Sequence, residues 1–408
     1  MSASPGAGGM RRPLLVMVSG KPWDGVRGAD RHLTDQLVRW TRVLWVDPPV
    51  SPATPARHRP GVGRLLRPRL AAAGPGVLRL TPVALPGLSR PGIRAATWPT
   101  VRAQLRWALR RLGDRPRAVV VCSLDDVLGR WGDDVVDVLY GTDDWVAGAE
   151  LMGLDRRWLE GQERRALDRA DLVVAVTPAL ARRWADLGAE PLLIPNGCDP
   201  GTYADVDDAP APADAAVLPG PVAGLIGRIT ARIDIDLLEA VVDEGLSLLA
   251  VGPRDTAWEP ERWAALAGRP GVLHVDGVPF AELPRWMRMI DVGLTPYADT
   301  AFNRSSFPLK TMEYLAAGRA AVGTGLPATR WLADHTDGLV RIAEPAEFAS
   351  AARAAAEQPR TAELVARRRA AAARHSWAER AHRLATAVGV TVPLADADAG
   401  TGEKESVW

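Results

Sequence analysis

The chain has 408 residues, 47% of them hydrophobic and 24% charged, with a net charge of +1. These values are typical of a globular protein and exclude a disordered or fibrous one, and the length suits two domains of roughly 150 to 200 residues. Cys122 and Cys198 lie far apart without histidine or cysteine neighbours at ligand spacing. This argues against a disulfide scaffold or a zinc site, and we expect a reducing, cytoplasmic environment.

The charge is unevenly distributed along the chain. Residues 1–120 hold 21 Arg and Lys against 5 Asp and Glu, a net +16, which leaves −15 for the rest. A biased genome composition explains abundant arginine but not the missing acids. We therefore expect the first half to face an anionic partner: a phosphorylated acceptor or the inner membrane surface, and not nucleic acid. The first twelve residues lack an apolar segment, so we expect no signal peptide, and no apolar run is long enough for a membrane span.

In the first half, short apolar runs alternate with helical patterns, which predicts a parallel sheet wrapped by helices. The runs are 14–18, 43–46, 118–121, 135–139, 172–176 and 192–194. Residues 98–112 read as a basic amphipathic helix carrying Arg102, Arg106, Arg110 and Arg111. Two interpretations stay open for it: a helix lying on an anionic membrane, or one packing on the core.

A second series of runs follows and predicts a second α/β domain. It comprises 222–226, 246–251, 272–275, 292–294, 320–323 and 339–342. Residues 204–220, rich in Pro, Ala and Asp, are the predicted flexible linker, about 346–388 is helical, and 391–408 is a disordered tail without assigned chemistry. Two doubly wound domains bind ligands at the carboxyl ends of their strands, so the cleft between them is the expected active site.

The strand at 222–226 ends in Gly227-Arg228, where glycine lets a ligand approach the backbone and arginine can grip a diphosphate. Arg232, one turn on, could share that task. The alternative is an arginine that caps the sheet edge. We interpret Asp234 and Asp236 as helix-start acids and not as metal ligands.

A second motif runs from Ser306 to Val322. Lysine is rare here: 47 arginines accompany only Lys21, Lys310 and Lys404. With Ser306 as cap and Pro308 in the first turn, the free N–H groups of a helix would lie beside Lys310 and form an anion site, although a solvated surface lysine is the alternative. Glu313, a turn further, could accept two hydrogen bonds from a ribose diol.

Together these residues describe a site for a nucleotide-diphosphate sugar. Gly227-Arg228, followed about eighty residues later by Pro308-Leu-Lys-Thr-Met-Glu-Tyr-Leu-Ala-Ala-Gly318, resembles the donor domain of GT-B glycosyltransferases of family 4, also called group 1. The resemblance implies a retaining glycosyltransferase that needs no metal, because Arg228 and Lys310 stabilise the leaving diphosphate. It also implies a hydroxyl acceptor: an envelope glycan, a lipid-linked molecule or a natural product.

The resemblance extends over most of the chain. The motifs at 140–145, 163, 169–180 and 194–199 are similar to the family's run into its hinge, and those at 22–25 and 46–49 to the branch with teichuronic acid transferases. It implies an acceptor domain at 1–203, a donor domain at 221–372 and a closing helix at 373–390 that packs back on the first domain.

One position departs from the family pattern. The family commonly carries two glutamates separated by seven residues, and Ser305 occupies the place of the first. That carboxylate normally lies near the donor sugar, so the identity of the sugar is open. Asn303 and Arg304 could contact the sugar instead, against the alternative of a plain loop.

On the acceptor side, Asp143 or Asp144 follows the strand at 135–139 and could orient the acceptor hydroxyl or take its proton. The alternative is a turn-forming pair that caps a helix. The backbone of Gly20 could approach the diphosphate from across the cleft, and Lys21 could meet the acceptor.

Two other functions stay open. A nucleotide-sugar epimerase or hydrolase would share the donor site but needs a general acid and base near the sugar, which Ser305 does not supply. A non-catalytic partner that binds nucleotide sugars would tolerate loss of charge at the phosphate site, so the presence of Arg228, Lys310 and Glu313 argues against it. A nicotinamide oxidoreductase is disfavoured because no glycine-rich fingerprint follows either first strand.

Overall fold

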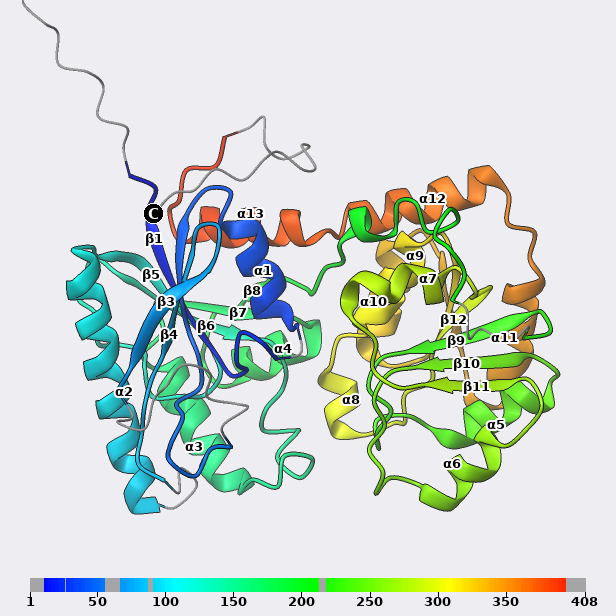
Figure 1. Cartoon of the computed structure of the whole chain (residues 1–408), viewed down its shortest axis with the longest axis horizontal. Helices are drawn as coiled ribbons and strands as arrows, with labels where there is room; N and C mark the ends of the chain where they lie inside the picture. Colours follow the sequence, from blue (N-terminus) through cyan, green and yellow to red (C-terminus); the bar gives the residue numbers. More distant parts are fainter. Residues whose placement is uncertain (1–10, 26, 56–66, 87–90, 213–217, 394–408) are drawn as a thin grey trace, which may run out of the picture.

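The computed structural model describes residues 11–25, 27–55, 67–86, 91–212 and 218–393. Figure 1 shows two α/β domains side by side, each built around one sheet. The two sheets follow the two predicted series of apolar runs, and the predicted fold class of two doubly wound α/β domains is confirmed. Part of the predicted linker, 213–217, and residues 394–408 of the predicted tail lie outside the described residues.

The first sheet has the order β3-β4-β2-β1-β5-β6-β7-β8, and every pair is parallel except β3 with β4. Its strands are β1 (Leu14–Ser19), β2 (Arg42–Val46), β3 (Arg69–Gly74), β4 (Val77–Thr81), β5 (Pro116–Cys122), β6 (Val136–Gly141), β7 (Leu172–Ala175) and β8 (Leu192–Leu193). The predicted series lacks β3 and β4. Three alanines in β3 weaken its strand signal, and antiparallel pairing at the sheet edge forms it nonetheless.

Both faces of this sheet are buried, because side chains along β1 alternate between two cores. Leu14, Val16 and Val18 pack with α2, α3 and α4, whereas Leu15 and Met17 pack with α1 and α13. The bounds are α1 (Ala29–Leu37), α2 (Pro91–Leu112), α3 (Arg156–Leu167), α4 (Pro178–Asp186) and α13 (Trp377–Ala387).

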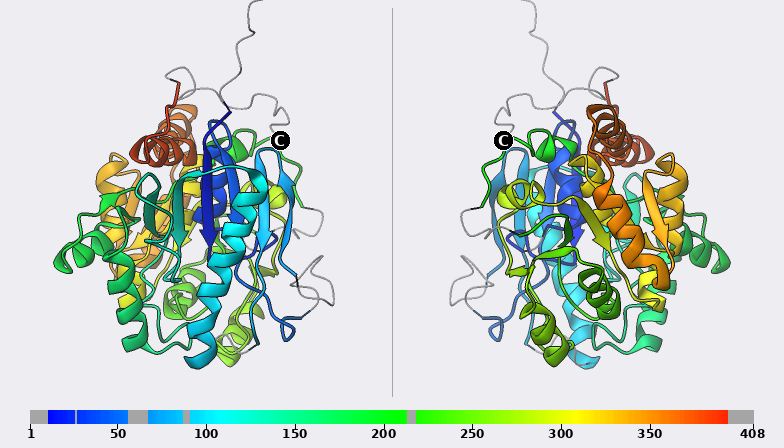
Figure 2. Two further views of the ribbon diagram at one scale, coloured as in Figure 1. Left: turned by 90° about the vertical axis from the view of Figure 1, so that its left-hand side faces the viewer. Right: turned by 90° about the vertical axis from the view of Figure 1, so that its right-hand side faces the viewer.

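Helix α2 contains the predicted basic amphipathic helix and lies across the outer face of the sheet (Figure 2, left). Val101, Leu105 and Leu109 are buried in the core, so the core-packing interpretation is confirmed and this apolar face is not open to a membrane. Arg110 and Arg111 are exposed at the end of the helix. Across the described ranges, no helix combines the length and apolar character needed to cross a bilayer.

The second sheet is entirely parallel, in the order β11-β10-β9-β12-β13-β14. Its strands are β9 (Val222–Ile226), β10 (Ser247–Val251), β11 (Val272–Val275), β12 (Val292–Thr295), β13 (Ala320–Thr324) and β14 (Val340–Ala343). Helices α5 (Ile235–Asp243), α6 (Pro260–Ala267) and α11 (Phe348–Glu357) cover one face. The other face is covered by α7 (Leu283–Met287), α9 (Leu309–Ala316), α10 (Pro327–His335) and α12 (Ala362–Ala373).

The predicted helical stretch 346–388 is three helices and not one. Pro359 separates α11 from α12, and Ser376 caps α13 by accepting a hydrogen bond from the Glu379 amide at 3.2 Å. Figure 1 shows α12 over the second domain and α13 over the first. Helix α13 packs on α1, so the closing helix lies where the resemblance implied.

The first part of the predicted linker is packed and not free. Tyr203, at the end of the short helix η2 (Pro200–Tyr203), and Val206 are fully buried in the core of the second domain. Asp207 pairs with Arg319 at 2.6 Å. Tyr203 precedes the predicted linker 204–220 and belongs to the predicted first domain 1–203, so the chain reaches the second domain earlier than predicted, at residue 203, because this large aromatic side chain is buried there.

Candidate functional site

The strand order places two pairs of neighbouring strands at switch points, β1 with β5 and β9 with β12. In open α/β sheets ligands bind at the carboxyl ends of such strands. Gly20 directly follows β1 and Gly227 directly follows β9, so both predicted backbone positions lie at switch points.

Gly227 and Lys310 are brought together, as the motif spacing predicts. Gly227 has φ +129°, and a Cβ placed on it would lie 3.8 Å from Lys310 Cε. Gly252, after β10, also has a positive φ, and a Cβ there would lie 2.0 Å from the Gly227 carbonyl oxygen. Glycine is therefore required directly after β9 and after β10, and no side chain covers the backbone beside Lys310 at Gly227.

Lys310, Glu313 and Tyr203 form a connected group. The Lys310 ammonium donates to both carboxylate oxygens of Glu313, at 2.9 and 2.8 Å, and the Tyr203 hydroxyl donates to Glu313 Oε2 at 2.7 Å. Glu313 and Tyr203 are buried, while Lys310 keeps 23% of its side chain exposed. Burial and the Glu313 charge raise the pKa of Tyr203, so its hydroxyl stays a hydrogen-bond donor.

The helix that carries Lys310 starts later than predicted. Ser306 does not cap it: the residue ends the short helix α8 (Ala301–Ser305), and α9 begins at Leu309 with Pro308 in the cap position and no side-chain cap bond. The predicted cap is therefore wrong, because the fixed backbone of Pro308 defines the helix start. The Ser306 side chain is instead buried and faces Asp143.

The two predicted arginines differ in their surroundings. Arg228 is exposed, and its side chain makes no hydrogen bond or ion pair within the described ranges. Arg232 lies between the Tyr297 and Phe302 rings, 5.0 Å from each centroid, and its Nε donates to Asn303 Oδ1 at 2.9 Å. Arg228 is thus free to meet a ligand, whereas Arg232 is largely held by the protein.

Asn303 and Arg304, the two predicted sugar contacts, are both committed to protein partners. They lie on α8 and not in a plain loop. The Asn303 amide nitrogen donates to the carbonyls of Arg232 and Ala298, at 2.9 and 2.8 Å, so both of its protons are used. Arg304 pairs with Asp299, an exposed contact on the protein surface. The structure therefore offers no free Asn303 donor for the predicted sugar contact.

Asp143 and Asp144 have different environments. Asp143 faces the second domain: burial and neighbouring Asp144 raise its pKa against the effect of Arg232, Lys21 and the Ser306 hydroxyl. Asp144 is buried, and Arg183 holds it through two hydrogen bonds of 3.0 and 2.9 Å. The first carboxylate therefore lies among Arg232, Lys21 and Ser306, and the second belongs to an ion pair with Arg183.

The segment after β1 lies against the start of α1. Lys21 is exposed, and a Cβ on Gly28 would lie 3.2 Å from its Nζ and 2.7 Å from Asp30 Oδ1. The Ser19 hydroxyl donates to the Lys21 carbonyl at 2.9 Å and also contacts the Asp30 carboxylate. Gly20, Lys21 and the first turn of α1 thus form one surface.

His32 is a site residue that the sequence analysis did not identify. Its ring stacks on Trp377 at 5.1 Å and meets the edge of Phe280, from the second domain, at 5.7 Å. Burial, together with Arg27, Lys310 and Arg31, lowers its pKa to about 3. Leu309, the residue before Lys310, packs against the same core cluster as α1, so the first turn of α1 lies near the Lys310–Glu313 pair.

The sequence analysis also did not identify Tyr203, which bonds to Glu313. Only four tyrosines occur in the chain, and this one follows the hinge motif at 194–199, which is the one available signal. Within the described chain, no three histidine, cysteine or acidic side chains are grouped as metal ligands. Asp234 caps α5, accepting from the Asp236 amide at 3.0 Å, as interpreted.

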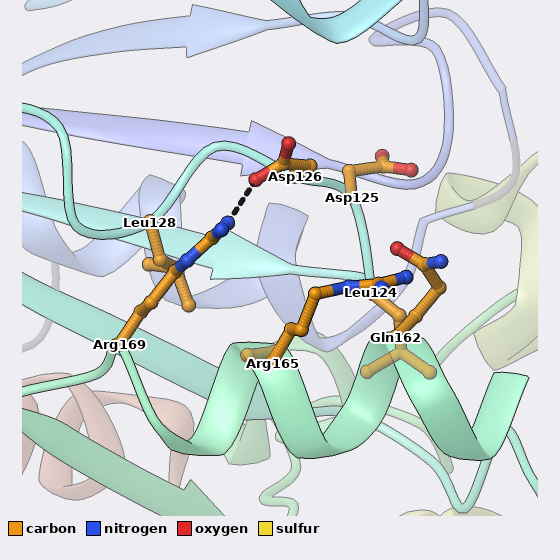
Figure 3. A pocket seen from close by; sticks show the side chains of 8 residues that line it. Leu124, Asp125, Asp126, Leu128, Gln162, Arg165 and Arg169 are labelled. Carbon is orange, nitrogen blue, oxygen red and sulfur yellow. Dashed lines mark hydrogen bonds and ion pairs between the residues drawn. The ribbon is translucent and has the colours of Figure 1, made fainter. Parts of the chain in front are cut away.

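A small hollow beside α3 is not a ligand site. Figure 3 shows Asp125 and Asp126 above Arg165, Gln162 and Arg169, with Arg169 paired to Asp126. Its volume of about 10 Å³ holds at most a single water molecule.

Comparisons with known proteins agree with this geometry. Residues 220–358 match the family model described as "Glycosyl transferases group 1". The second domain is therefore similar to the group 1 glycosyltransferases over this segment. The matched segment contains Gly227, Arg228, Lys310 and Glu313.

One curated relative also matches part of the chain. The chain is 30% identical over 183 residues to the "Putative teichuronic acid biosynthesis glycosyltransferase TuaH" of Bacillus subtilis (strain 168). The similar region covers 43% of this chain and 45% of that protein, so it spans less than half of the relative.

Solved structures share the fold of the whole chain. Sucrose-phosphate synthase from Thermosynechococcus elongatus has a TM-score of 0.68 at 16% identity and covers 92% of this chain and 98% of its own. A trehalose-phosphate synthase from Burkholderia xenovorans has a TM-score of 0.66 at 15% identity, covering 92% and 100%. Anabaena HepE, in complex with UDP and glucose, has a TM-score of 0.62 at 16% identity, covering 94% and 100%. The whole chain therefore has the two-domain GT-B fold.

Proposed function

We propose that the chain is a glycosyltransferase that moves a sugar from a nucleotide-diphosphate sugar to a hydroxyl acceptor, with retention at the anomeric carbon and without a metal ion. The observation that carries the proposal is the Lys310–Glu313 pair beside Gly227, with Arg228 free at the end of β9. The group 1 match over this segment and the complex of Anabaena HepE with UDP support the same donor class.

The hydrogen bonds around Glu313 suggest how a donor would bind. A carboxylate offers about four acceptor positions, and Lys310 and Tyr203 use three of them. A ribose diol needs two, so its binding requires the ammonium to release at least one bond to Glu313. A diphosphate would attract that ammonium. The ribose of the same nucleotide would then replace the ammonium at Glu313, and the diphosphate would replace Glu313 at Lys310.

The leaving group governs the chemistry that these residues can perform. Arg228 and Lys310 would stabilise charge as it develops on the departing diphosphate, and this takes over the role that a metal ion has in other transferases. The acceptor hydroxyl would attack as the sugar–oxygen bond breaks, and its proton would go to the leaving oxygen or to Asp143. Because its pKa is raised, Asp143 is the carboxylate better suited to hold that proton.

The basic first half supports a further part of the proposal, contact with an anionic acceptor or with the inner face of a membrane. Trp107, Arg110 and Arg111 are exposed on α2. Association with vesicles of anionic lipid should weaken as salt rises from low to physiological concentration. Equal binding at both salt concentrations would contradict this part and leave the donor site untouched.

The experiment that tests the proposal is a thermal-shift panel of UDP-, GDP- and dTDP-sugars, followed by assay of product with the sugar that binds. A ligand at a hundred times its dissociation constant stabilises by about 2.7 kcal/mol, so one donor should raise the melting temperature clearly. The product should keep the anomeric configuration and form in the presence of a chelator. A chain that none of these nucleotides stabilises, or that needs a divalent ion, would contradict it.

A further inference from the structure

A cavity of about 380 Å³ lies beside Asp144, between the two domains. Residues 144–147, α3 and α4 form its wall in the first domain, and Ala301 and Ser305 of α8 form its wall in the second. This volume lies within the range of roughly 300 to 1,000 Å³ that small-molecule sites occupy. We propose that the cavity binds a neutral sugar unit of the acceptor, an inference that rests on the proposed function and extends it.

The charges that line the cavity favour a neutral ligand. Three arginines face three carboxylates: Arg156, Arg164 and Arg183 with Asp144, Glu160 and Glu163. The formal charges cancel, which disfavours a phosphate or a polyanion. Sugar hydroxyls both donate and accept hydrogen bonds, so they suit a lining with both kinds of group.

The inner wall is rigid but keeps unused acceptors. Arg183 donates to both Asp144 and Glu163, at 2.6 to 3.0 Å. The Ala147 amide donates a further bond to Asp144, and Trp184 Nε1 donates a further bond to Glu163. Each carboxylate therefore has three of about four acceptor positions filled. One acceptor position remains on each of these two carboxylates, which line the cavity with 2% of each side chain exposed.

The outer wall supplies donors and an apolar surface. Arg164 is exposed and has no hydrogen-bond or ion-pair partner in the described part of the chain, and Arg156 pairs only with Glu160, at 3.2 Å. Leu187, 41% exposed, and Ala301 form an apolar edge at the opening. A sugar ring has the same two characters, hydroxyls around its rim and C–H groups on its face.

The cavity adjoins the donor side of the cleft. Asp143 faces Arg232 and Ser306, while its neighbour Asp144 faces the cavity. Likewise Ser306 faces Asp143, while Ser305, in the place of the missing glutamate, lines the cavity. The Thr177 hydroxyl donates to the Ser305 carbonyl at 3.0 Å and joins the two walls. A sugar in this cavity would lie beside Asp144 and Ser305, which are the sequence neighbours of the two residues that face the donor side, Asp143 and Ser306.

The test measures saccharide binding to the full chain by saturation-transfer NMR, with the nucleoside diphosphate that binds best already present. The probes are methyl glycosides of glucose, galactose and N-acetylglucosamine, with glucuronic acid and inorganic phosphate as charged comparisons. Ala301→Phe narrows the opening from an exposed position, and Glu160→Gln removes one carboxylate at constant volume. Ala265→Phe, at an exposed alanine of α6 outside the cavity, is the matched control.

We expect a neutral glycoside to bind, to weaken by about tenfold in Ala301→Phe, and to stay within roughly twofold in the control. Glu160→Gln should weaken it less than Ala301→Phe does, and nucleotide binding should not change in any variant. Unchanged glycoside binding in Ala301→Phe would overturn the proposal. So would tighter binding of phosphate or glucuronic acid, or nucleotide binding without any glycoside binding. Absence of nucleotide binding would instead mark a failure of the proposed function.

Discussion

Two groups of paired charged side chains lie near the cleft, one in each domain, and they differ in how many carboxylates hold the cation. Around Arg183, the guanidinium donates four hydrogen bonds to two carboxylates, Asp144 and Glu163. Around Glu313, the ammonium of Lys310 bonds to one carboxylate only, through two of its three donors. Opposite charge is common to both groups, and the cations are similarly exposed, 32% for Arg183 and 23% for Lys310. A cation held by a single carboxylate beside the backbone of Gly227 distinguishes the group suited to an anionic ligand.

The largest expected effect breaks the donor-side group. Lys310→Ala or Arg228→Ala should lower turnover by about a hundredfold or more, because a well-placed donor to the leaving group is lost. Release of nucleoside diphosphate measures the rate. Arg330→Ala, an exposed arginine paired with Glu344, is the control and should keep normal activity. Near-normal rates in either site variant would rule out the phosphate contact.

Removing the cation of the group in the first domain, Arg183, should lower the stability of the protein. Arg183→Ala leaves Asp144 and Glu163 buried beside each other without their cation, and we expect a loss of about 3 kcal/mol in the free energy of unfolding. Urea denaturation measures it. A variant with full stability would show that this group is not a structural ion pair, and the contrast between the two groups would fail.

Tyr203→Phe sharpens the comparison within the donor-side group. It removes one hydrogen bond to a buried carboxylate, so the free energy of unfolding should fall by about 1 to 2 kcal/mol. Tyr297→Phe is the control, because the Tyr297 hydroxyl has no hydrogen bond within the described ranges. Equal stability of the two variants would contradict the role assigned to Tyr203.

His32 should give the smallest effect, on the pH dependence of stability. Its folded pKa of about 3 lies below the unfolded value of 6.5, so the unfolded state binds a proton first as pH falls. The free energy of unfolding therefore falls as the pH drops below 6.5, by about 1 kcal/mol between pH 6.5 and 5.5. His32→Phe, which keeps the stack on Trp377, should lose less between pH 7.5 and 5.5. Parallel curves for the two proteins would contradict a buried neutral histidine.

Local patterns were sufficient for the regular parts of the fold and for the donor motif. The runs that became β1 and β9 are continuous and apolar because both faces of each sheet are covered. Gly227 and Lys310 each follow from a local requirement, a positive φ at a strand end and a charge at a helix start. Such requirements can be read from a few neighbouring residues.

What the sequence could not predict depends on contacts between distant segments. Tyr203 and Glu313 are 110 residues apart in the chain, and His32 meets Phe280 from the other domain. The two neighbouring aspartates, 143 and 144, look alike in sequence, and only the position of Arg183 separates their environments. Ser306 was assigned to the wrong helix because Pro308 sets the start of α9.

The central claim is that Arg228 and Lys310 hold the diphosphate of a donor. Calorimetric titration of the preferred nucleoside diphosphate and of its nucleoside, into the native chain and into Arg228→Ala and Lys310→Ala, tests it most directly. The native chain should bind the diphosphate much more tightly than the nucleoside, and each variant should lose most of that difference while binding the nucleoside as before. Equal affinity for the diphosphate in all three proteins would contradict the account.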